Sequence, residues 1–173
     1  MSASEVIQAI ESAFDGVERP DTSLRQFRLT DQKGLSEDIS NEEWLNAGQS
    51  RIDHTWQEIP ESEIEECEVV LAHMQAAEFR YYLPAYMRHA VNHLSDPVWR
   101  SDILSMTVSS LFPSRNHPDL YSYSVRQMSL LDQGQRQAVI QFLKFVAENA
   151  DFVQRPDAQK ALERYWLADD DKR

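Results

Sequence analysis

Two histidines four positions apart are the residues whose type and spacing could do chemistry. His89 and His93 lie in EFRYYLPAYMRHAVNH, residues 78–93. On a helix, side chains at i and i+4 share a face, so both imidazoles could bind one metal ion. The metalloprotease motif has a glutamate after its first histidine, where this chain has Ala90, so that general base is missing. A third ligand would have to come from His73, Glu78 or His117.

Aromatic and basic side chains fill the same stretch. Tyrosine and arginine are enriched among the residues that dominate binding energy at protein interfaces. The candidates for such a binding face are Tyr81, Tyr82, Tyr86 and Arg88. The alternative is internal bracing, because tyrosine rings pack well in cores and arginines pair with glutamates.

Residues 61–74 predict a helix with one acidic side. Its apolar residues recur at helical spacing: Ile64, Cys67, Leu71 and Met74. Glutamates crowd its first turns, where negative charge favours the positive end of the helix dipole. Such a charge run is usually a solvated face. The functional alternative is that Glu61, Glu65 and Glu68 bind a basic partner.

The composition is that of an ordinary globular protein. The 173 residues, 42% hydrophobic and 27% charged, suit a single domain over 1–173. Only four glycines are present, which disfavours the many tight turns of an all-β fold. The single cysteine, Cys67, excludes an internal disulfide. Neither a leader pattern nor a long apolar run is visible, so we expect a cytoplasmic protein.

Charge limits the classes of partner. Asp and Glu number 29 against 17 Lys and Arg, a formal net charge of −12. This charge repels phosphate backbones and anionic lipid surfaces, so we expect no nucleic-acid and no membrane partner. A basic protein is the partner that this charge favours.

Hydrophobic periodicity predicts the elements that must position these residues. Helices are expected over 4–14, 61–74, 97–113 and 136–149, with a last one from Pro156. Pro84 predicts a break, with one helical piece ending near Tyr82 and another beginning at the proline; the alternative is a helix that continues through the proline with only a kink.

The remaining segments are less regular. Residues 17–60 predict ordered loops and short helices, 120–128 predict extended chain, and 168–173 predict a frayed acidic tail. The expected fold is mainly α, a compact domain of about five helices, with a small α+β arrangement as the alternative.

The run FRYYLPAYM, residues 79–87, resembles the signature of a family of small bacterial proteins with a domain of unknown function. The resemblance extends to three further points: Trp56 with Ile59-Pro60, the Leu-x-x-x-Gln pattern of 131–135, and Phe142-Leu143. It covers roughly residues 56–150. The resemblance implies one compact domain and brings no activity with it.

These features favour a non-catalytic role. Neither a phosphate-binding glycine loop nor a Gly-x-Ser-x-Gly elbow is present, and no cofactor is expected. We expect a protein-binding protein, of the kind that acts as an immunity or antitoxin-type inhibitor of a basic partner. One alternative is a metal-dependent hydrolase that uses His89 and His93. Another is a homo-oligomeric scaffold, such as a homodimer, that packs through the tyrosine-rich stretch.

Overall fold

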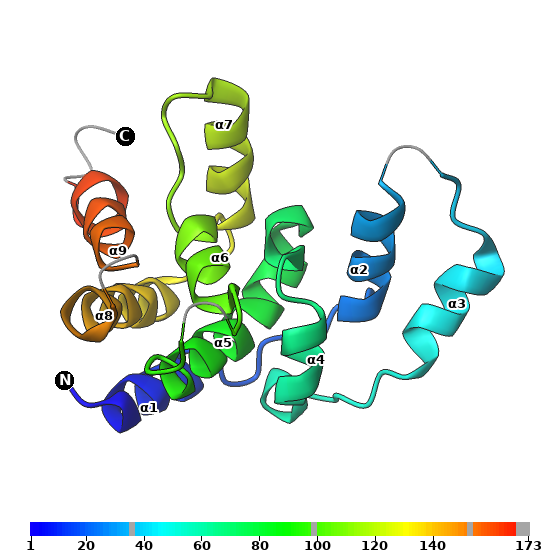
Figure 1. Cartoon of the computed structure of the whole chain (residues 1–173), viewed down its shortest axis with the longest axis horizontal. Helices are drawn as coiled ribbons and strands as arrows, with labels where there is room; N and C mark the ends of the chain where they lie inside the picture. Colours follow the sequence, from blue (N-terminus) through cyan, green and yellow to red (C-terminus); the bar gives the residue numbers. More distant parts are fainter. Residues whose placement is uncertain (35–36, 98–99, 152–153, 169–173) are drawn as a thin grey trace.

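The computed structural model describes residues 1–34, 37–97, 100–151 and 154–168. Within these ranges it contains helices and no strand, which confirms the mainly α fold (Figure 1). The N-terminal elements are α1 (Ala3–Ala13), α2 (Leu24–Lys33), α3 (Asn41–Gln49), η1 (Trp56–Glu58), α4 (Glu61–Glu66) and η2 (Val70–His73). The C-terminal ones are α5 (Ala76–Asn92), α6 (Ile103–Ser110), α7 (Pro118–Gln127), α8 (Gln133–Asn149), α9 (Arg155–Ala161) and η3 (Leu162–Trp166).

Helices α5 and α8, of 17 residues each, contribute more buried residues to the core than any other described element. Helix α1 packs against both, and α9 packs on α8 (Figure 1). Helices α2 and α3 pack on each other and form an arm beside this body. None of the described helices is both long and apolar enough to cross a bilayer.

Two of the predicted helices, α1 and α8, begin with a capping box. The hydroxyl of Ser2 accepts a hydrogen bond from the Glu5 amide, and the Glu5 carboxylate accepts one from the Ser2 amide. Asp132 and Gln135 form the same reciprocal box at the start of α8. Each box satisfies amide groups that the first helical turn leaves without partners.

The predicted break at Pro84 is wrong. Helix α5 continues from Ala76 to Asn92 through the proline. Pro84 and its neighbours Leu83 and Ala85 are all buried in the core. Packing on both sides therefore outweighs the missing amide donor, a loss of about 3 kcal/mol in an isolated helix.

The predicted helix over 61–74 is divided. Helix α4 ends at Glu66, and the chain resumes as the short η2. Cys67 leaves helical angles at this point, and its carbonyl accepts a hydrogen bond from the Tyr86 hydroxyl. A tertiary contact from α5 thus replaces the helical bonding of this turn.

The predicted extended chain over 120–128 is wrong, because these residues belong to α7. Pro118 occupies its first turn, as is typical of helix starts. Gln127, buried at its end, donates hydrogen bonds from Nε2 to the carbonyls of Leu71 and Met74, at 3.1 and 2.7 Å.

The outcomes for three other segments are mixed. Helix α6 begins at Ile103 rather than at Pro97, and the predicted Val98 and Trp99 lie outside the described residues. Residues 17–60 hold short helices, as predicted, although the ten-residue α2 had no clear apolar signal. Of the predicted frayed tail, residues 169–173 lie outside the described ranges.

Candidate functional site

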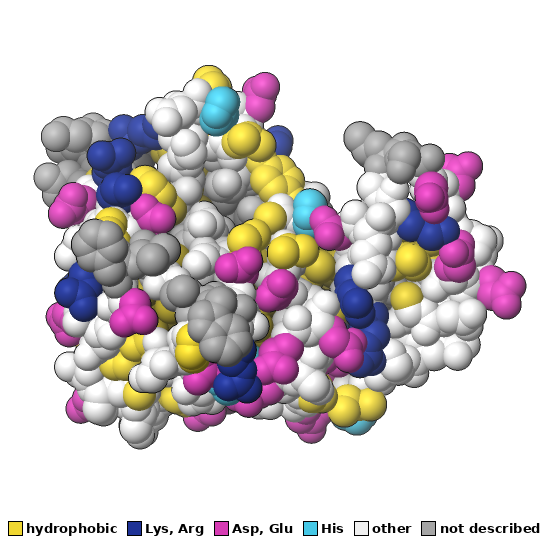
Figure 2. Space-filling model, viewed as in Figure 1, with side chains coloured by type: hydrophobic (Ala, Val, Ile, Leu, Met, Phe, Trp, Pro, Cys, Tyr) yellow, Lys and Arg dark blue, Asp and Glu magenta, His cyan; other side chains and the backbone are white. Residues whose placement is uncertain are grey.

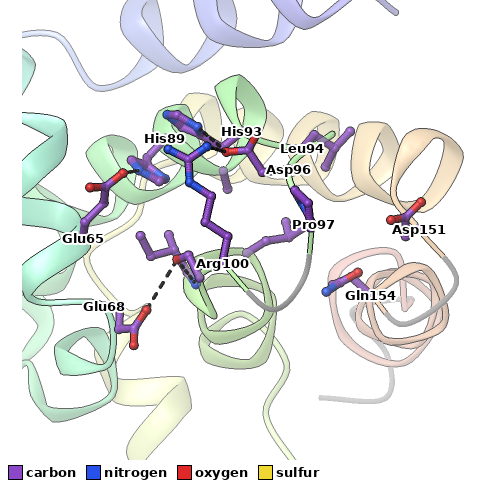
Figure 3. A pocket seen from close by; sticks show the side chains of 14 residues that line it. Glu65, Glu68, His89, His93, Leu94, Asp96, Pro97, Arg100, Asp151 and Gln154 are labelled. Atoms are coloured by element: carbon purple, nitrogen blue, oxygen red, sulfur yellow. Dashed lines mark hydrogen bonds and ion pairs between the residues drawn. The ribbon is translucent and has the colours of Figure 1, made fainter.

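A pocket of about 140 Å³ lies at the C-terminal end of α5, between α4, α6 and the chain that precedes α9 (Figure 3). Its charged lining comprises Glu65, Glu68, Asp96, Asp151 and Arg100. Figure 3 shows Glu65 and Glu68 on one side of the pocket and Asp151 on the other, with Arg100 between them. Among the described lining residues, four carboxylates are therefore accompanied by one guanidinium and two imidazoles.

The pocket carboxylates differ in how they are held. Arg100 pairs with Asp96 at 3.0 Å. Glu68 accepts weak hydrogen bonds from the Ser101 hydroxyl and the Asp102 amide, at 3.4 and 3.3 Å. These bonds involve no cation, so they leave the negative charge of Glu68 uncompensated.

His89 reaches the pocket from α5 and is only 3% exposed. Its Nε2 lies 3.5 Å from Oε1 of Glu65, which is too long for a good hydrogen bond. Neither ring nitrogen has a hydrogen-bond partner. Burial, assisted by the nearby charge of His93, lowers the pKa of His89.

His93 lies one turn further along α5 and is surrounded by carboxylates. Its Nδ1 is 2.9 Å from Asp96 Oδ2, and its Nε2 is 3.3 Å from Glu61 Oε2. Partial burial opposes the charged form, but the hydrogen bonds with Asp96 and Glu61 prevail and raise the pKa of His93. The rings of His89 and His93 stack with centroids 4.3 Å apart and an interplanar angle of 25°.

The tyrosines proposed as a binding face are buried in the core. Tyr81 donates a hydrogen bond to Asp53, Tyr82 to the carbonyl of Thr22, and Tyr86 to that of Cys67. A partner that docks on the folded surface does not reach these rings. Their positions match the alternative interpretation, internal bracing.

Arg88 is occupied within the fold as well. Its guanidinium donates to the carbonyl of Gln57 at 3.1 Å and lies 5.2 Å from the centre of the Trp56 ring. Trp56 in turn donates from its indole nitrogen to the carbonyl of Phe14. Arg88 therefore fixes η1 to α5.

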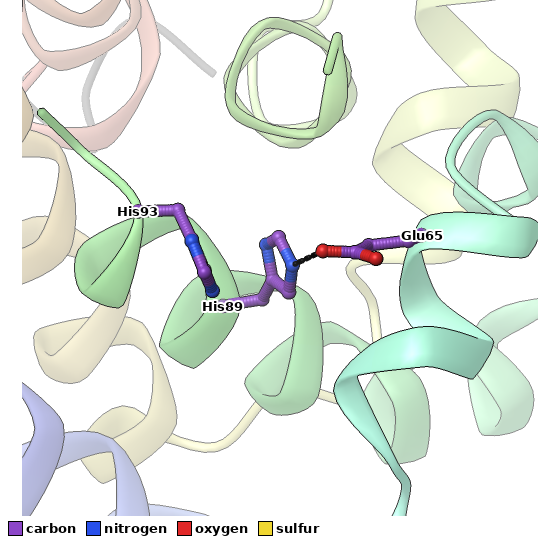
Figure 4. Close-up of side chains that lie close together, drawn as sticks. All are labelled: Glu65, His89 and His93. Atoms are coloured by element: carbon purple, nitrogen blue, oxygen red, sulfur yellow. Dashed lines mark ion pairs between the residues drawn. The ribbon is translucent and has the colours of Figure 1, made fainter. Parts of the chain in front are cut away.

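The glutamates and histidines singled out in the sequence do come together. Glu65 and Glu68 line the pocket, and Glu61 contacts His93 from its rim. Within the described ranges, one trio of candidate ligands has its ligand atoms all within 4.8 Å of one another: Glu65, His89 and His93 (Figure 4). The third candidate ligand is thus Glu65, rather than the predicted His73, Glu78 or His117.

Among the charged and amide side chains that line the pocket, sequence reasoning missed four: Asp96, Arg100, Asp151 and Gln154. The spacing of His93, Asp96 and Arg100, at i, i+3 and i+7, was a local signal for the first two. Asp151 and Gln154 reach the pocket through tertiary packing, for which the sequence holds no local signal.

Comparisons with known proteins place the chain by family. No curated protein and no solved structure matches it. A model of a family of unknown function, DUF6714, matches residues 2–170, nearly the whole length. The chain belongs to this family of unknown function, DUF6714.

Proposed function

We propose that the protein is a non-catalytic binding protein whose acid-lined pocket receives a positively charged group from a basic protein partner. The observation that carries this proposal is the unequal lining, in which four carboxylates, Glu65, Glu68, Asp96 and Asp151, are accompanied by one guanidinium, Arg100, and by the imidazoles of His89 and His93. An ammonium or guanidinium group entering there offsets charge that the fold leaves uncompensated.

The accessibility of the carboxylates supports this role. The side chain of Glu65 is 48% exposed, and that of Asp96 is 34% exposed, so an incoming cation can reach both. Acidic side chains are spread over the face in Figure 2, with fewer basic ones among them. A field of this sign speeds the encounter with a cationic partner.

The α2–α3 arm supports a protein as the partner. Helix α3 has no buried residue, and its Leu45 is 63% exposed. The exposed Glu42 lies three positions before Leu45 on the same helix. An apolar side chain beside an acidic one is a combination that protein interfaces use. An immunity or antitoxin-type inhibitor of a basic toxin is the specific form of partner binding that we propose.

Affinity capture with three baits tests the proposal. The baits are the wild-type chain, Glu65→Gln/Glu68→Gln, and Glu11→Gln/Glu148→Gln, which removes the same charge from exposed positions on α1 and α8. We expect a basic protein that is retained by the wild-type and control baits and lost from the pocket variant. The same proteins on all three baits, or no specific protein on any, would contradict the proposal.

Binding strength provides the quantitative form of this test. With the captured protein purified, we expect the pocket variant to bind at least about tenfold more weakly, because two charge-assisted contacts are lost. The control variant should stay within about twofold, since distant surface charges act mainly on the association rate.

A further inference from the structure

We propose that Glu65, His89 and His93 form a binding site for a divalent transition-metal ion of the zinc class. The site lies at the end of the pocket where α4 meets α5 (Figure 4). It shares the Glu65 carboxylate with the proposed cation pocket, but it also needs the lone pairs of two imidazole nitrogens. The inference does not depend on a protein partner, and it is tested with the purified chain alone.

The state of His89 carries the inference. Its ring is almost fully buried, yet neither nitrogen has a hydrogen-bond partner. A buried polar atom without a partner is costly, and native proteins rarely leave one. The ring lines the pocket, and its Nε2 points toward Glu65 at 3.5 Å. A metal ion between these two groups gives Nε2 the partner that it lacks and neutralises the Glu65 carboxylate, while Nδ1 gains no partner from it.

The surroundings of His93 match those of a histidine that binds a metal ion. A histidine ligand usually gives its other ring N–H to a carboxylate, which fixes its tautomer and orientation. Asp96 holds Nδ1 of His93 at 2.9 Å, whereas the Glu61 contact to Nε2 is longer, at 3.3 Å. We therefore assign Nε2 of His93 as the ligand atom. Metal binding then replaces its contact with Glu61.

The separations of the three ligand atoms show how far these atoms must approach one another to bind zinc. Tetrahedral zinc, with bonds of about 2.0–2.1 Å, places its ligand atoms about 3.3 Å apart. The three ligand atoms here lie within 4.8 Å of one another, so some separations must shorten by up to about 1.5 Å. The stacked rings must also turn, because nearly parallel rings do not aim their lone pairs at one point. The side chains of Glu65 and His93 are partly exposed and can move, whereas the buried side chain of His89 stays in place.

The donor set indicates which ions fit. Two imidazoles and one carboxylate suit zinc, cobalt and nickel, whereas magnesium and calcium prefer sites made of oxygen alone. Three protein ligands leave a fourth position for water or for a donor group from another molecule.

Calorimetric titration of the purified, metal-stripped chain with zinc chloride tests the site. We expect one ion per chain with micromolar affinity or better, and no heat of binding with magnesium or calcium. His93→Gln and Glu65→Gln should each weaken zinc binding at least about tenfold, because each removes one of three ligands. Both residues are partly exposed, so these variants should fold, and circular dichroism checks that they do.

His54→Gln is the matched control. His54 Nδ1 lies 3.2 Å from Glu58 in an exposed i,i+4 pair, so it resembles the site but lacks a second histidine. We expect its zinc affinity to stay within about twofold of the wild type. Absence of zinc binding by the wild type would overturn the inference. Equal affinity of His93→Gln, Glu65→Gln and His54→Gln would do the same, since zinc would then bind elsewhere.

Discussion

The hydroxyl of Tyr81 donates a 2.7 Å hydrogen bond to the carboxylate of Asp53, which also pairs with Arg51 at 2.9 Å. Both charged side chains are less than a tenth exposed. Arg51 further donates to the carbonyl of Pro20. These contacts connect the FRYYLPAYM run on α5 to the segment that precedes α4. The sequence predicted this segment as part of a region of ordered loops and short helices.

Asp53→Asn should lower the free energy of unfolding by about 3–5 kcal/mol, because it leaves the guanidinium of Arg51 buried without a counter-charge. Urea denaturation at pH 7 measures this loss. Glu58→Gln, which breaks the exposed pair with His54, should cost no more than about 1 kcal/mol. If both variants lose the same small amount, Asp53 does not hold the segment.

The Arg51–Asp53 pair should also make the free energy of unfolding depend on pH in the acid range. Burial opposes ionisation, but hydrogen bonds from Arg51 and Tyr81 prevail and lower the pKa of Asp53 below its ordinary 3.8. A lowered pKa gives stability that is complete above the unfolded value and is lost as pH falls through the folded one. The difference in free energy of unfolding between the wild type and Asp53→Asn should therefore become smaller below about pH 3.8 in urea titrations. A constant gap would contradict this assignment.

Gln127→Leu should destabilise the fold by about 1–3 kcal/mol, because it removes a buried donor from three carbonyls, of which Leu71 keeps only a 3.4 Å contact from the Met74 amide and Met74 keeps the Tyr123 hydroxyl. The amide of Gln127 donates to the carbonyls of Leu71, Ala72 and Met74. Thermal unfolding followed by circular dichroism measures the effect. Gln133→Leu, at an exposed position on α8, is the control and should change stability by less than about 0.5 kcal/mol.

His89→Gln and His93→Gln should have opposite pH dependence. The pKa of His93 is raised, so its contribution is complete below the unfolded value and is lost as pH rises through the folded one. The pKa of His89 is lowered, so its protonation in the unfolded chain destabilises the fold as pH falls.

Urea unfolding in a chelating buffer, between about pH 8 and 5, checks this contrast. Relative to the wild type, His93→Gln should lose more stability toward pH 5, whereas His89→Gln should recover stability there. Parallel curves for the two variants would show that the histidines do not differ in environment.

The fold could be predicted where local signals agreed with packing. Helices α1 and α8 combine capping boxes with strong apolar periodicity, and both were predicted within three residues of their start. Prediction failed where tertiary contacts override local rules. Pro84 sits inside α5 because the surrounding core holds it, and α7 is helical although its tyrosines and serines alternate.

The candidate site could be predicted only in part. The spacing of His89 and His93 is a local signal, and the glutamates of α4 were recognised as a charged group. Their meeting depends on how α4 crosses α5, which no spacing encodes. The tyrosines were ambiguous for the opposite reason, because composition alone does not distinguish a buried ring from an exposed one.

The central structural claim is that Glu65, His89 and His93 close around one zinc ion where α4 meets α5. A crystal structure of the chain grown with zinc, with anomalous data collected at the zinc absorption edge, tests it most directly. We expect one anomalous peak about 2.0–2.2 Å from Glu65, His89 Nε2 and His93 Nε2. A map with no peak there, with Glu65 and His89 still 3.5 Å apart, would contradict the account.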